Sequence, residues 1–595
     1  MQKDEQRNII LAIVLSLAIL LGFNFLTAPS EEELAAQRAA FEAEQAQLAE
    51  DANSGDPSTP QLDSTLSAIE NAAAGLTAPL DRSEALDQTP RIAIRTPKLE
   101  GSISLRGGRI DDLTLSTFFE TIQTDSPNIT LLSPVGSLAP YYAEFGWISS
   151  DSSIAVPDSK TVWSSTVDTL TPSQPVTLFW ENGSGLRFER EISVDENFLF
   201  SVKQRVINNG SSATELAPYS LISRTGTPEL LGFYILHEGP IGVLDNSLVE
   251  VDYDDLQDEK LIQNRTTGGW LGITDQYWLT ALIPDQEQSV QTRFVYTGKG
   301  NTTRYQTDYF YDPVAVSAGE TVTFDSNVFL GAKEVTLIDD YQEELNITDF
   351  DLAVDFGWFY YITKPMFFAL HWITGVVGNV GVAILILTLA IKIPLFPLAN
   401  KSYASMAKMR KLTPKMTALR ERFGDDKQKL NQEMMNLYRQ EKVNPAAGCL
   451  PILIQIPIFF SLYKVLFVTL EMRQAPFFGW IQDLSAPDPT SIINGFGLLP
   501  WDVPELGILG FINLGVWPIL MGLSMFLQQR LNPQPTDPVQ AKVFMLMPFF
   551  FTFLLATFPA GLVIYWTWNN LLSIIQQALI MKKAGVPLGR QPDEA

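Results

Sequence analysis

The sequence predicts a polytopic α-helical membrane protein with six transmembrane helices, five of them forming a core, and a large all-β sandwich domain outside the membrane. Two observations carry this prediction. Apolar runs long enough to cross a bilayer occur near the N-terminus and throughout the last 240 residues. Charge separates in the same way, because residues 28–355 hold 19 Lys and Arg against 52 Asp and Glu, whereas residues 356–595 hold 20 against 13. The acidic middle and the basic C-terminal part are therefore expected in different environments.

Residues 1–27 are predicted to be an N-terminal transmembrane anchor. Lys3 and Arg7 precede an apolar stretch from Ile9 to Leu26, which is longer than the core of a signal peptide, about 7–15 residues. A cleavable signal is the alternative, since "FLTA" offers small residues, but Pro29 follows directly. We interpret the run as an uncleaved anchor with the N-terminus in the cytoplasm.

The next two segments differ in composition. Residues 28–90 are rich in Ala, Glu, Gln, Ser and Asp and contain almost no aromatic residues, which predicts a flexible exported tether. Residues 91–345 contain short runs of β-forming residues, such as "VTLFW" and "TVTFDSNVFL", between Gly, Asn and Asp turns. Short strands over this length, with no long helical period, predict an exported antiparallel β-sandwich.

Five apolar runs are predicted to span the membrane and to form a core over residues 376–583. They extend approximately over Val376–Leu398, Cys449–Leu470, Leu506–Leu527, Val543–Phe558 and Leu562–Ile580. Residues 401–445 between the first two are basic, since Lys401 to Lys442 holds 11 Lys and Arg against 5 Asp and Glu. The stretch "MKKAGVPLGR" before the C-terminus is basic too. The positive-inside rule therefore places residues 401–445 and the tail, residues 584–595, in the cytoplasm. With the anchor, the chain then crosses six times with both ends inside.

Two further elements flank the first run of the core. Residues 346–375 have mixed polarity and several aromatic side chains, which predicts an interfacial segment along the outer leaflet. Ser402–Phe423 and Asp425–Lys442 are predicted to be the two helices of a cytoplasmic hairpin. The chain breaks between them at "FGDD", where Asp425 or Asp426 caps the second helix.

The residue counts exclude several kinds of chemistry. One cysteine, Cys449, and two histidines, His237 and His371, cannot build an intrachain disulfide or a His/Cys metal cage. A Ser-His-Asp site is equally hard to build. The "TGKG" at Thr297–Gly300 lacks the spacing and the Ser or Thr of a nucleotide-binding loop. The residue counts therefore favour neither a bound metal nor nucleotide-driven chemistry, and the family resemblance described next implies that the protein is not an enzyme and needs no cofactor.

Long motifs in the C-terminal part resemble the YidC/Oxa/Albino family of membrane protein insertases. They are "YASMAKMRKLTPKM", "GDDKQKLNQEMMNLYRQEKVNPAAGCLPILIQIPIFFSLY", "RQAPFFGWIQDLSAPDP" and "FPAGLVIYWTWNNLLSIIQQ", and the similarity covers nearly all of Phe350–Lys583. "GGWLGITDQYWLTALIP", Gly268–Pro284, is similar to the periplasmic domain of Gram-negative members. The resemblance implies an inner-membrane insertase that acts alone or with the Sec translocon. Such a protein moves short polar segments of nascent membrane proteins through a hydrophilic groove and releases their transmembrane helices into lipid.

The resemblance also implies which residues line the groove. In register with "YASM", the basic residue of the family's first core helix falls on Lys392, where many Gram-negative relatives have arginine. Thr388, one turn earlier, matches a groove-lining threonine. Aromatic residues of the last helix match Tyr565 and Trp566, although relatives often have tyrosine where Trp566 stands. A wet groove shortens the path through hydrocarbon, where each charged side chain costs about 2.5–3.5 kcal/mol, and a cation inside it attracts acidic segments.

These residues also have simpler interpretations. Lys392 lies six residues before the end of its run, where lysine commonly extends to the headgroups, and Trp566 is typical of an interface anchor. Polar residues elsewhere either line the same cavity or form hydrogen bonds between helices, which is the commoner role. They are Gln455, Ser461, Lys464, Ser524, Gln528, Asn569 and Asn570.

The hairpin likewise has two interpretations. Its methionines either form an adaptable surface for nascent hydrophobic segments or pack between the two helices. They are Met406, Met409, Met416, Met434 and Met435. Its positive charge suits ribosomal RNA or anionic lipid, or acts only to fix topology. By resemblance, "NPQPTDP" at Asn532–Pro538 is a second candidate for cytoplasmic contacts.

Two other classes of function explain parts of the sequence. A membrane transporter or channel accounts for a lysine in an apolar run, but the sequence lacks the internal repeats typical of transporters. A membrane-anchored periplasmic sugar-binding protein accounts for the sandwich, because the family's periplasmic domain resembles mutarotases. Mutarotase chemistry relies on two histidines and a carboxylate, and this domain has one histidine, His237. No small-molecule substrate is expected.

Overall fold

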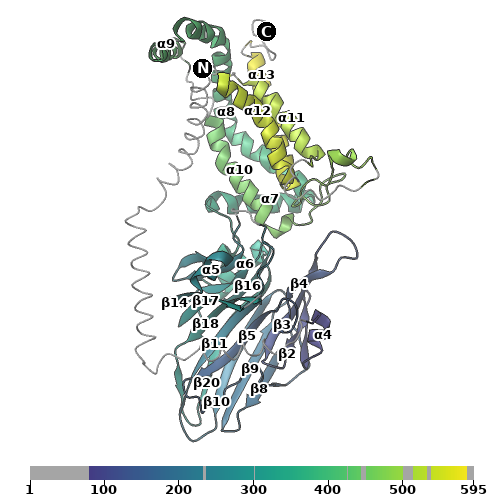
Figure 1. The fold of residues 1–595 in the computed structure, drawn as a ribbon, viewed down its shortest axis with the longest axis vertical. Helices are drawn as coiled ribbons and strands as arrows, with labels where there is room; N and C mark the ends of the chain where they lie inside the picture. Colours follow the sequence, from purple (N-terminus) through teal and green to yellow (C-terminus); the bar gives the residue numbers. More distant parts are fainter. Residues whose placement is uncertain are drawn as a thin grey trace. The chain divides into compact units, whose positions relative to one another are not determined.

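The computed structural model describes residues 80–583 and 585, apart from 232–235, 300–301, 425, 442, 444–449, 500, 502–512 and 533–537. The predicted N-terminal anchor and most of the predicted tether lie outside the described residues. The chain divides into two compact units (Figure 1). We call the part up to Asp355 the β unit and the part from Phe356 the helical unit.

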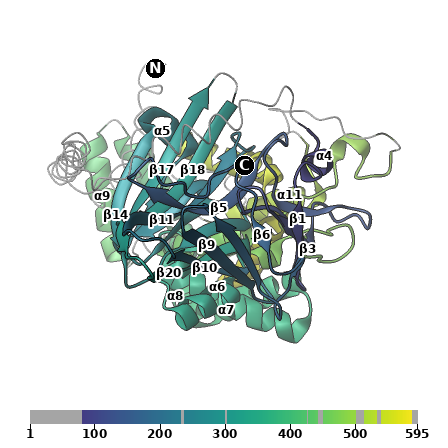
Figure 2. The same ribbon diagram turned by 90° about the horizontal axis from the view of Figure 1, so that it is seen from below.

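The β unit consists of two sheets, which confirms the predicted all-β sandwich (Figures 1 and 2). The first sheet has the order β14 (Leu261–Thr267), β17 (Ser289–Lys299), β18 (Thr302–Tyr311), β11 (Thr214–Thr225), β5 (Tyr141–Ser149), β3 (Arg109–Phe119), β2 (Leu99–Ser104), β1 (Arg91–Arg95) and β7 (Thr169–Leu170). Beside this path, β19 (Val314–Val316) pairs with β11 and β4 (Asn128–Leu132) pairs with β3. The second sheet has the order β13 (Ser247–Glu250), β12 (Gly239–Leu244), β15 (Trp270–Thr274), β16 (Trp278–Ile283), β20 (Thr321–Ala332), β10 (Leu199–Asn208), β9 (Leu186–Val194), β8 (Val176–Glu181) and β6 (Ser164–Ser165).

Buried side chains alternate with more exposed ones along strands of the sandwich, and the buried ones form its core. In β9 every second residue from Leu186 to Val194 is buried, as expected for a strand with one face toward a core. One of these buried residues is Arg190, whose guanidinium donates to the carbonyl of Gly108 at 2.6 Å. A buried ion pair joins Arg109 Nε to Glu144 at 2.5 Å. The core therefore contains two buried guanidinium groups that bond within the fold, although Arg190 Nε has no partner among the described residues.

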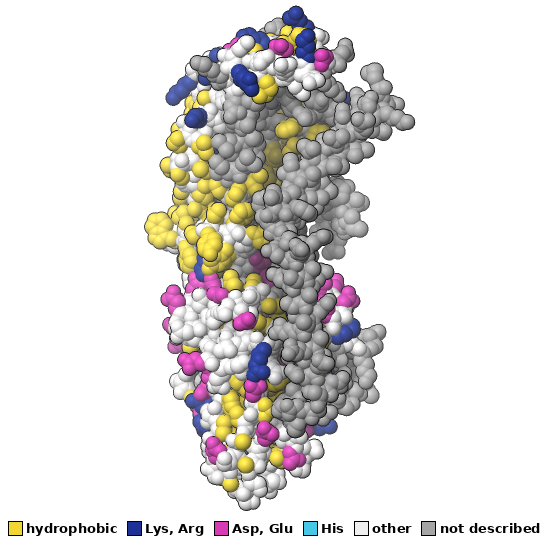
Figure 3. All heavy atoms as spheres, turned by 90° about the vertical axis from the view of Figure 1, so that its left-hand side faces the viewer, with side chains coloured by type: hydrophobic (Ala, Val, Ile, Leu, Met, Phe, Trp, Pro, Cys, Tyr) yellow, Lys and Arg dark blue, Asp and Glu magenta, His cyan; other side chains and the backbone are white. Residues whose placement is uncertain are grey.

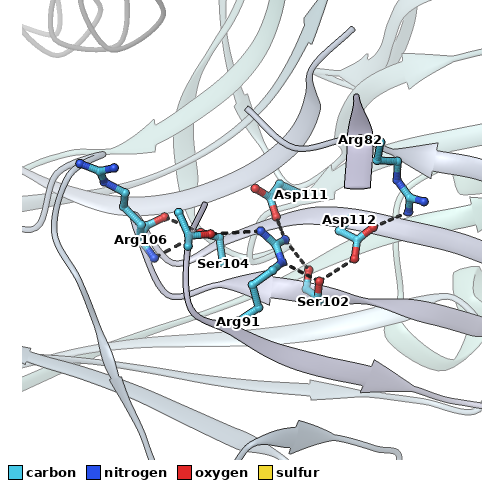
Figure 4. Close-up of polar contacts among 8 residues, drawn as sticks. Arg82, Arg91, Ser102, Ser104, Arg106, Asp111 and Asp112 are labelled. Carbon is cyan, nitrogen blue, oxygen red and sulfur yellow. Dashed lines mark hydrogen bonds and ion pairs between the residues drawn. The ribbon is translucent and has the colours of Figure 1, made fainter. Parts of the chain in front are cut away.

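The folded unit begins before the predicted boundary at residue 90. Helix α4 (Arg82–Leu86) precedes β1, and Arg82 forms an ion pair with Asp112 of β3 (Figure 4). Arg91 forms a second ion pair with Asp111. Burial raises the pKa of the Asp111 carboxyl, and the neighbouring Arg91 opposes that rise. These contacts fix residues 82–91 to the sheet, although their polar composition resembles that of the tether.

The β unit also ends later than predicted. Helix α5 (Tyr253–Glu259) lies between strands, and α6 (Val335–Leu345) is followed by the short helix η1 (Phe350–Ala353). Phe350 is fully buried and packs edge-on against Trp270, with 5.5 Å between ring centroids. Residues 346–355, predicted as the start of the interfacial segment, therefore belong to the β unit.

The helical unit contains seven longer helices within its described residues. They are α7 (Tyr360–Val377), α8 (Val380–Phe423), α9 (Lys427–Gln440), α10 (Leu450–Val468), α11 (Val516–Leu531), α12 (Pro538–Leu554) and α13 (Ala560–Lys583). In the described part of the chain, α8 alone is long and apolar enough to cross a membrane, and Gln455–Val468 and Ala541–Thr557 are shorter apolar segments. The helical C-terminal part is therefore confirmed, whereas the predicted six crossings are not.

Helix α8 joins two elements that were predicted as separate. The first apolar run was expected to end at Leu398 and the first hairpin helix to begin at Ser402, but α8 continues through both for 44 residues. It does so despite three internal prolines, Pro394, Pro397 and Pro414, since helices tolerate proline as a bend where neighbours support them. The predicted cap of the second hairpin helix is confirmed, because the Asp426 side chain accepts from Lys429 N at 3.0 Å.

Contacts along α13 give the direction of its neighbours. In order along α13, they join Trp568 to Leu385, Asn570 to Ser524, Gln576 to Asn400 and Gln577 to Asn532. In each of these pairings, a higher residue number in α13 corresponds to a higher residue number in its partner helix. Helices α8, α11 and α13 therefore run in the same direction. Helices α10 and α12 run the other way, as shown by Phe459 with Trp566, Tyr463 with Phe558, Phe526 with Phe549 and Gln529 with Phe544. Five helices thus alternate in direction along the chain.

Candidate functional site

Polar side chains recur along one side of α13. Tyr565, Asn569 and Ser573 are spaced four residues apart, so they lie above one another on the same face of the helix. Gln455 of α10 and Lys392 of α8 join this series through hydrogen bonds. We call these five residues the polar row.

Lys392 is bound to the last member of the series. Its Nζ donates to Ser573 Oγ at 2.9 Å, and that hydroxyl donates to the carbonyl of Asn569 at 2.8 Å. The side chain is half-buried. Within the described part of the chain, no carboxylate forms an ion pair with it. The ammonium therefore lies against the neighbouring helix and has a neutral partner.

Gln455 and Tyr565 connect a third helix to the polar row. Gln455 Nε2 donates to Tyr565 Oη at 2.7 Å, and the Tyr565 side chain is buried. The structure thus brings Lys392, Gln455, Tyr565 and Asn569, all candidates from the sequence, to one series across three helices. The sequence analysis missed Ser573, which completes the series. Its spacing of four residues after Asn569 is the signal that could have identified it.

Two other candidates have different surroundings. Thr388 is buried, and its hydroxyl donates to the carbonyl of Ile384 in the preceding turn of α8 at 2.7 Å. Trp566 packs against Phe459 of α10 at 4.6 Å and Phe551 of α12 at 6.0 Å between ring centroids. The Thr388 hydroxyl therefore bonds within its own helix, and half-buried Trp566 packs against two neighbouring helices.

The remaining polar candidates mostly serve contacts between helices. Asn570 donates to Ser524 Oγ at 2.9 Å, which joins α13 to α11. Gln577, which the sequence analysis did not single out, is buried and donates to Asn532 at 3.0 Å. Ser461 is fully buried, and its hydroxyl has no partner within the described residues. Gln528 is half-buried on α11.

The hairpin methionines lie mainly inside the hairpin. Met406 and Met416 are buried, while Met409 and Met434 are partly buried against a cluster that contains Leu412 and Val443. Met435, by contrast, is 48% exposed. This arrangement fits the packing interpretation for Met409, Met416 and Met434 and leaves Met435 at the surface.

The single histidine of the β unit lies beside a backbone carbonyl and a carboxylate. His237 Nε2 lies 2.9 Å from the carbonyl of Pro240, and Nδ1 lies 3.4 Å from an Asp252 carboxylate oxygen. Among the residues that the structure describes, no three His, Cys, Asp or Glu side chains are grouped to hold a metal.

Comparisons with known proteins agree over nearly the whole length of the chain. The model of the YidC periplasmic domain matches residues 91–369, and that of the 60Kd inner membrane protein matches residues 372–586. The membrane protein insertase YidC of Beijerinckia indica is 51% identical over 597 residues, covering 98% of this chain and 97% of the relative. That of Methylobacterium nodulans is 50% identical over 595 residues, covering 98% and 96%. A crystal structure of an active YidC insertase covers 82% of this chain and 92% of its own, with 18% identity and a TM-score of 0.33. The chain belongs to the YidC family of membrane protein insertases.

Proposed function

We propose that this protein inserts nascent proteins into the bacterial inner membrane and that it is not an enzyme. Short polar segments of the client pass along the polar row, and the client's transmembrane helices enter the lipid. The observation that carries this proposal is the position of Lys392. This lysine lies in the apolar part of α8, and its Nζ lies 2.9 Å from the hydroxyl of Ser573 on the parallel helix α13. Family membership supports the activity itself.

The proposed topology has six crossings with both termini in the cytoplasm and the β unit in the periplasm. The alternating directions of α8, α10, α11, α12 and α13 support five passes through the bilayer. Hydrophobic side chains cover much of the helical unit in Figure 3, while Lys and Arg gather at the end that carries α9. Such a distribution suits an apolar belt with a cytoplasmic basic end.

Helix α7 supports an interfacial role at the outer leaflet. Trp358 just before it and Tyr361 within it are each 90% exposed, and Trp372 is 70% exposed. The opposite face of α7 is buried. Exposed aromatic rings on one side of a helix are typical of segments that lie at headgroup level.

The depth of Lys392 argues for a functional role. It lies 12 residues after the start of α8, or about 18 Å along the helix, within a hydrocarbon core about 30 Å thick. A lysine at this depth costs about 2.5–3.5 kcal/mol on insertion scales. Since Ser573 is neutral, the ammonium keeps an uncompensated charge that attracts acidic side chains of an arriving segment. The client's apolar helix gains about 25 cal/mol for each Å² that leaves water.

The proposed partners are nascent membrane proteins, the Sec translocon, the ribosome and the lipid bilayer. The basic hairpin and the basic stretch "MKKAGVPLGR" before the C-terminus suit the ribosome. Exposed Met435 is the hairpin methionine best placed to touch a client. Groove contacts are proposed for Lys392, Gln455, Tyr565 and Asn569.

Reconstitution tests the proposed function. Purified protein in liposomes, without nucleotide, is expected to insert a short single-span client so that its exported segment becomes protected from added protease. A transporter or channel would instead carry a solute across the same vesicles. Absence of client protection, with solute flux in its place, would overturn the insertase assignment.

A further inference from the structure

A short segment before α11 exposes several large apolar side chains. We call residues 491–499, together with Trp501, the apolar loop. Leu498 is 87% exposed, and four further large side chains of the loop are between 39% and 51% exposed. They are Ile492, Phe496, Leu499 and Trp501. Loops that face water are ordinarily built from small and polar residues, and a cluster of exposed apolar side chains marks a surface that another phase or molecule covers.

The backbone of the apolar loop is hydrogen-bonded within the protein. At least seven of the eight N–H groups of residues 492–499 donate to acceptors in the loop itself or at Leu514. The indole N–H of Trp501 donates to the carbonyl of Ile493 at 3.1 Å. In water such groups can bond to solvent, whereas in lipid each of them needs a partner within the protein. The loop therefore meets a requirement that lipid imposes and water does not.

A strained turn keeps one aromatic ring of the loop at the surface. Gly495, Phe496 and Gly497 all have positive φ, at 60°, 61° and 89°. Glycine adopts this region freely, but a bulky residue there is strained and persists only where the surrounding structure holds it. The bond from Phe496 N to the carbonyl of Ser491 at 2.6 Å holds the turn. The loop thus keeps its shape although its side chains are exposed.

The loop and the segment before it carry little charge. Residues 474–499 contain no Lys or Arg and two acidic residues, Asp483 and Asp488. Asp483 accepts from Gln474 N at 3.1 Å, and Asp488 accepts from Trp517 N at 2.8 Å. Both carboxylates are therefore bonded within the helical unit. A surface of this kind offers no free charge to attract a charged protein, and an intramembrane position favours the same lack of charge.

Hydrogen bonding attaches the apolar loop to the start of α11. Ile492 N donates to the carbonyl of Leu514 at 2.9 Å, two residues before the helix begins at Val516. Helix α8 runs parallel to α11 and ends in the basic hairpin, which is proposed to lie in the cytoplasm, so the start of α11 belongs at the outer leaflet. Apolar surface continues along one face of α11, where three leucines spaced three and four residues apart are 40–52% exposed. They are Leu520, Leu523 and Leu527.

We propose that the apolar loop lies in the outer leaflet of the bilayer, at the boundary between headgroups and acyl chains, and that it holds the start of α11 there. This inference rests on the topology given under the proposed function. Tryptophan is enriched at this boundary, and Leu498, the most exposed side chain of the loop, enters the acyl chains. Lipid contact removes five large apolar side chains from water, which is the main contribution that fixes the loop.

Nitroxide labels measure the depth of the loop in the full-length protein. In a Cys449→Ser background, a label is attached at Leu498→Cys in liposomes of phosphatidylethanolamine and phosphatidylglycerol. Its relaxation by oxygen, which concentrates in lipid, is compared with its relaxation by a water-soluble nickel chelate. Leu546→Cys on α12, where the native side chain is 59% exposed, is the lipid reference, and Ser211→Cys in the β unit is the water reference. The ratio of oxygen to nickel relaxation at Leu498→Cys is expected to be several-fold higher than at Ser211→Cys and to approach that at Leu546→Cys.

Two results of this measurement would overturn the proposal. A label at Leu498→Cys that is relaxed by nickel as strongly as the label at Ser211→Cys would place the loop in water. A label protected from both oxygen and nickel would place it under protein, either the β unit or a second copy of the chain.

A charge substitution tests whether apolar side chains hold the loop in lipid. Leu498→Glu is expected to raise nickel relaxation of a label at Ile492→Cys several-fold, because a carboxylate draws the loop toward water. Leu498→Met is the matched control and should leave the relaxation unchanged. Thermal unfolding verifies that both variants are folded. Equal nickel relaxation in folded Leu498→Glu and Leu498→Met would overturn the proposal.

Insertion of a client into the same vesicles separates this inference from the proposed function. A loop in lipid, in a protein that inserts no client, would refute the insertase function and leave the lipid contact supported. A loop in water, in a protein that inserts clients, would overturn the lipid contact alone.

Discussion

At the scale of single residues, Lys392 shows what the sequence could predict and what it could not. Its position within an apolar run was visible, as was the match to a basic residue of the family. The contact of Lys392 with Ser573, 181 residues later, could not be predicted from this run alone. No local pattern contains that contact. Only the four-residue spacing of Asn569 and Ser573 hints at it.

We expect Lys392→Arg to keep insertion activity, because arginine preserves the positive charge with comparable reach. Lys392→Leu is expected to lose insertion of clients with acidic exported segments, and Lys392→Glu is expected to be worse because it repels them. Removing a costly charge should leave the fold as stable or more stable. The measurement is insertion of two clients that differ only in those acidic residues, at equal insertase levels. Equal insertion of both clients by Lys392→Leu would refute the groove role.

A second residue-scale prediction concerns the core of the β unit. Glu144 pairs with Arg109 and accepts from Tyr219 Oη at 2.8 Å, and all three side chains are buried. Glu144→Ala leaves a buried guanidinium without its partner, which costs about 3–5 kcal/mol. We expect a clear drop in the urea concentration at which half of the β unit is unfolded. Limited proteolysis of the full-length protein at increasing urea concentrations measures this midpoint.

Glu181→Ala is the control for that experiment. Its carboxylate is 65% exposed and pairs with Arg187 at 3.2 Å, and exposed ion pairs contribute about 0–1 kcal/mol. Similar midpoints for the two variants would show that the buried pair is not important for stability.

At the scale of elements, regular local patterns were predictable and long-range continuity was not. The alternation in β9 and the Asp426 cap follow from residue types at fixed spacing. The continuity of α8 does not, because Pro394 and Pro397 ordinarily argue for an end, and neighbouring helices decide whether they act as one. The stretch Arg473–Pro489 was quoted from the sequence as a family motif. Its hydrogen bonds to the starts of α8, α11 and α13 depend on residues far along the chain.

The topology prediction is tested at the hairpin formed by the end of α8 and by α9, which is expected to lie in the cytoplasm. In a Cys449→Ser background, we expect an impermeant maleimide added to intact cells to label Ser211→Cys in the β unit and to spare Ala418→Cys in α8. Both positions are exposed in their own units, so a difference in labelling reports the side of the membrane. Permeabilised cells should label both. Labelling of Ala418→Cys in intact cells would overturn the orientation.

At the scale of the whole molecule, the two units make different contributions to insertion. The charge contrast between residues 28–355 and 356–595 already separated them in the sequence. The boundary at Asp355 was not visible, because the packing of Phe350 on Trp270 joins segments 80 residues apart. This boundary decides how the contribution of the β unit can be tested.

A deletion that ends within the β unit, for example after Thr280, would leave β17, β18 and β20 without their partners β14, β11 and β10. The unpaired strand edges would favour aggregation, so a loss of activity would have no clear cause. Deleting residues 80–355 removes the described β unit as a whole and keeps α7.

We expect the protein without residues 80–355 to insert clients nearly as well as the full chain, since every member of the polar row lies in the helical unit. Deleting Gly357–Val377 instead should abolish insertion, because it removes the aromatic face of α7 and its packing on α8 and α10. Insertion into vesicles is compared at equal protein levels, after maleimide labelling has verified the orientation of each variant. If a stable, correctly oriented protein without the β unit fails to insert clients, then the path along the polar row is not sufficient, and the periplasmic unit takes part in insertion.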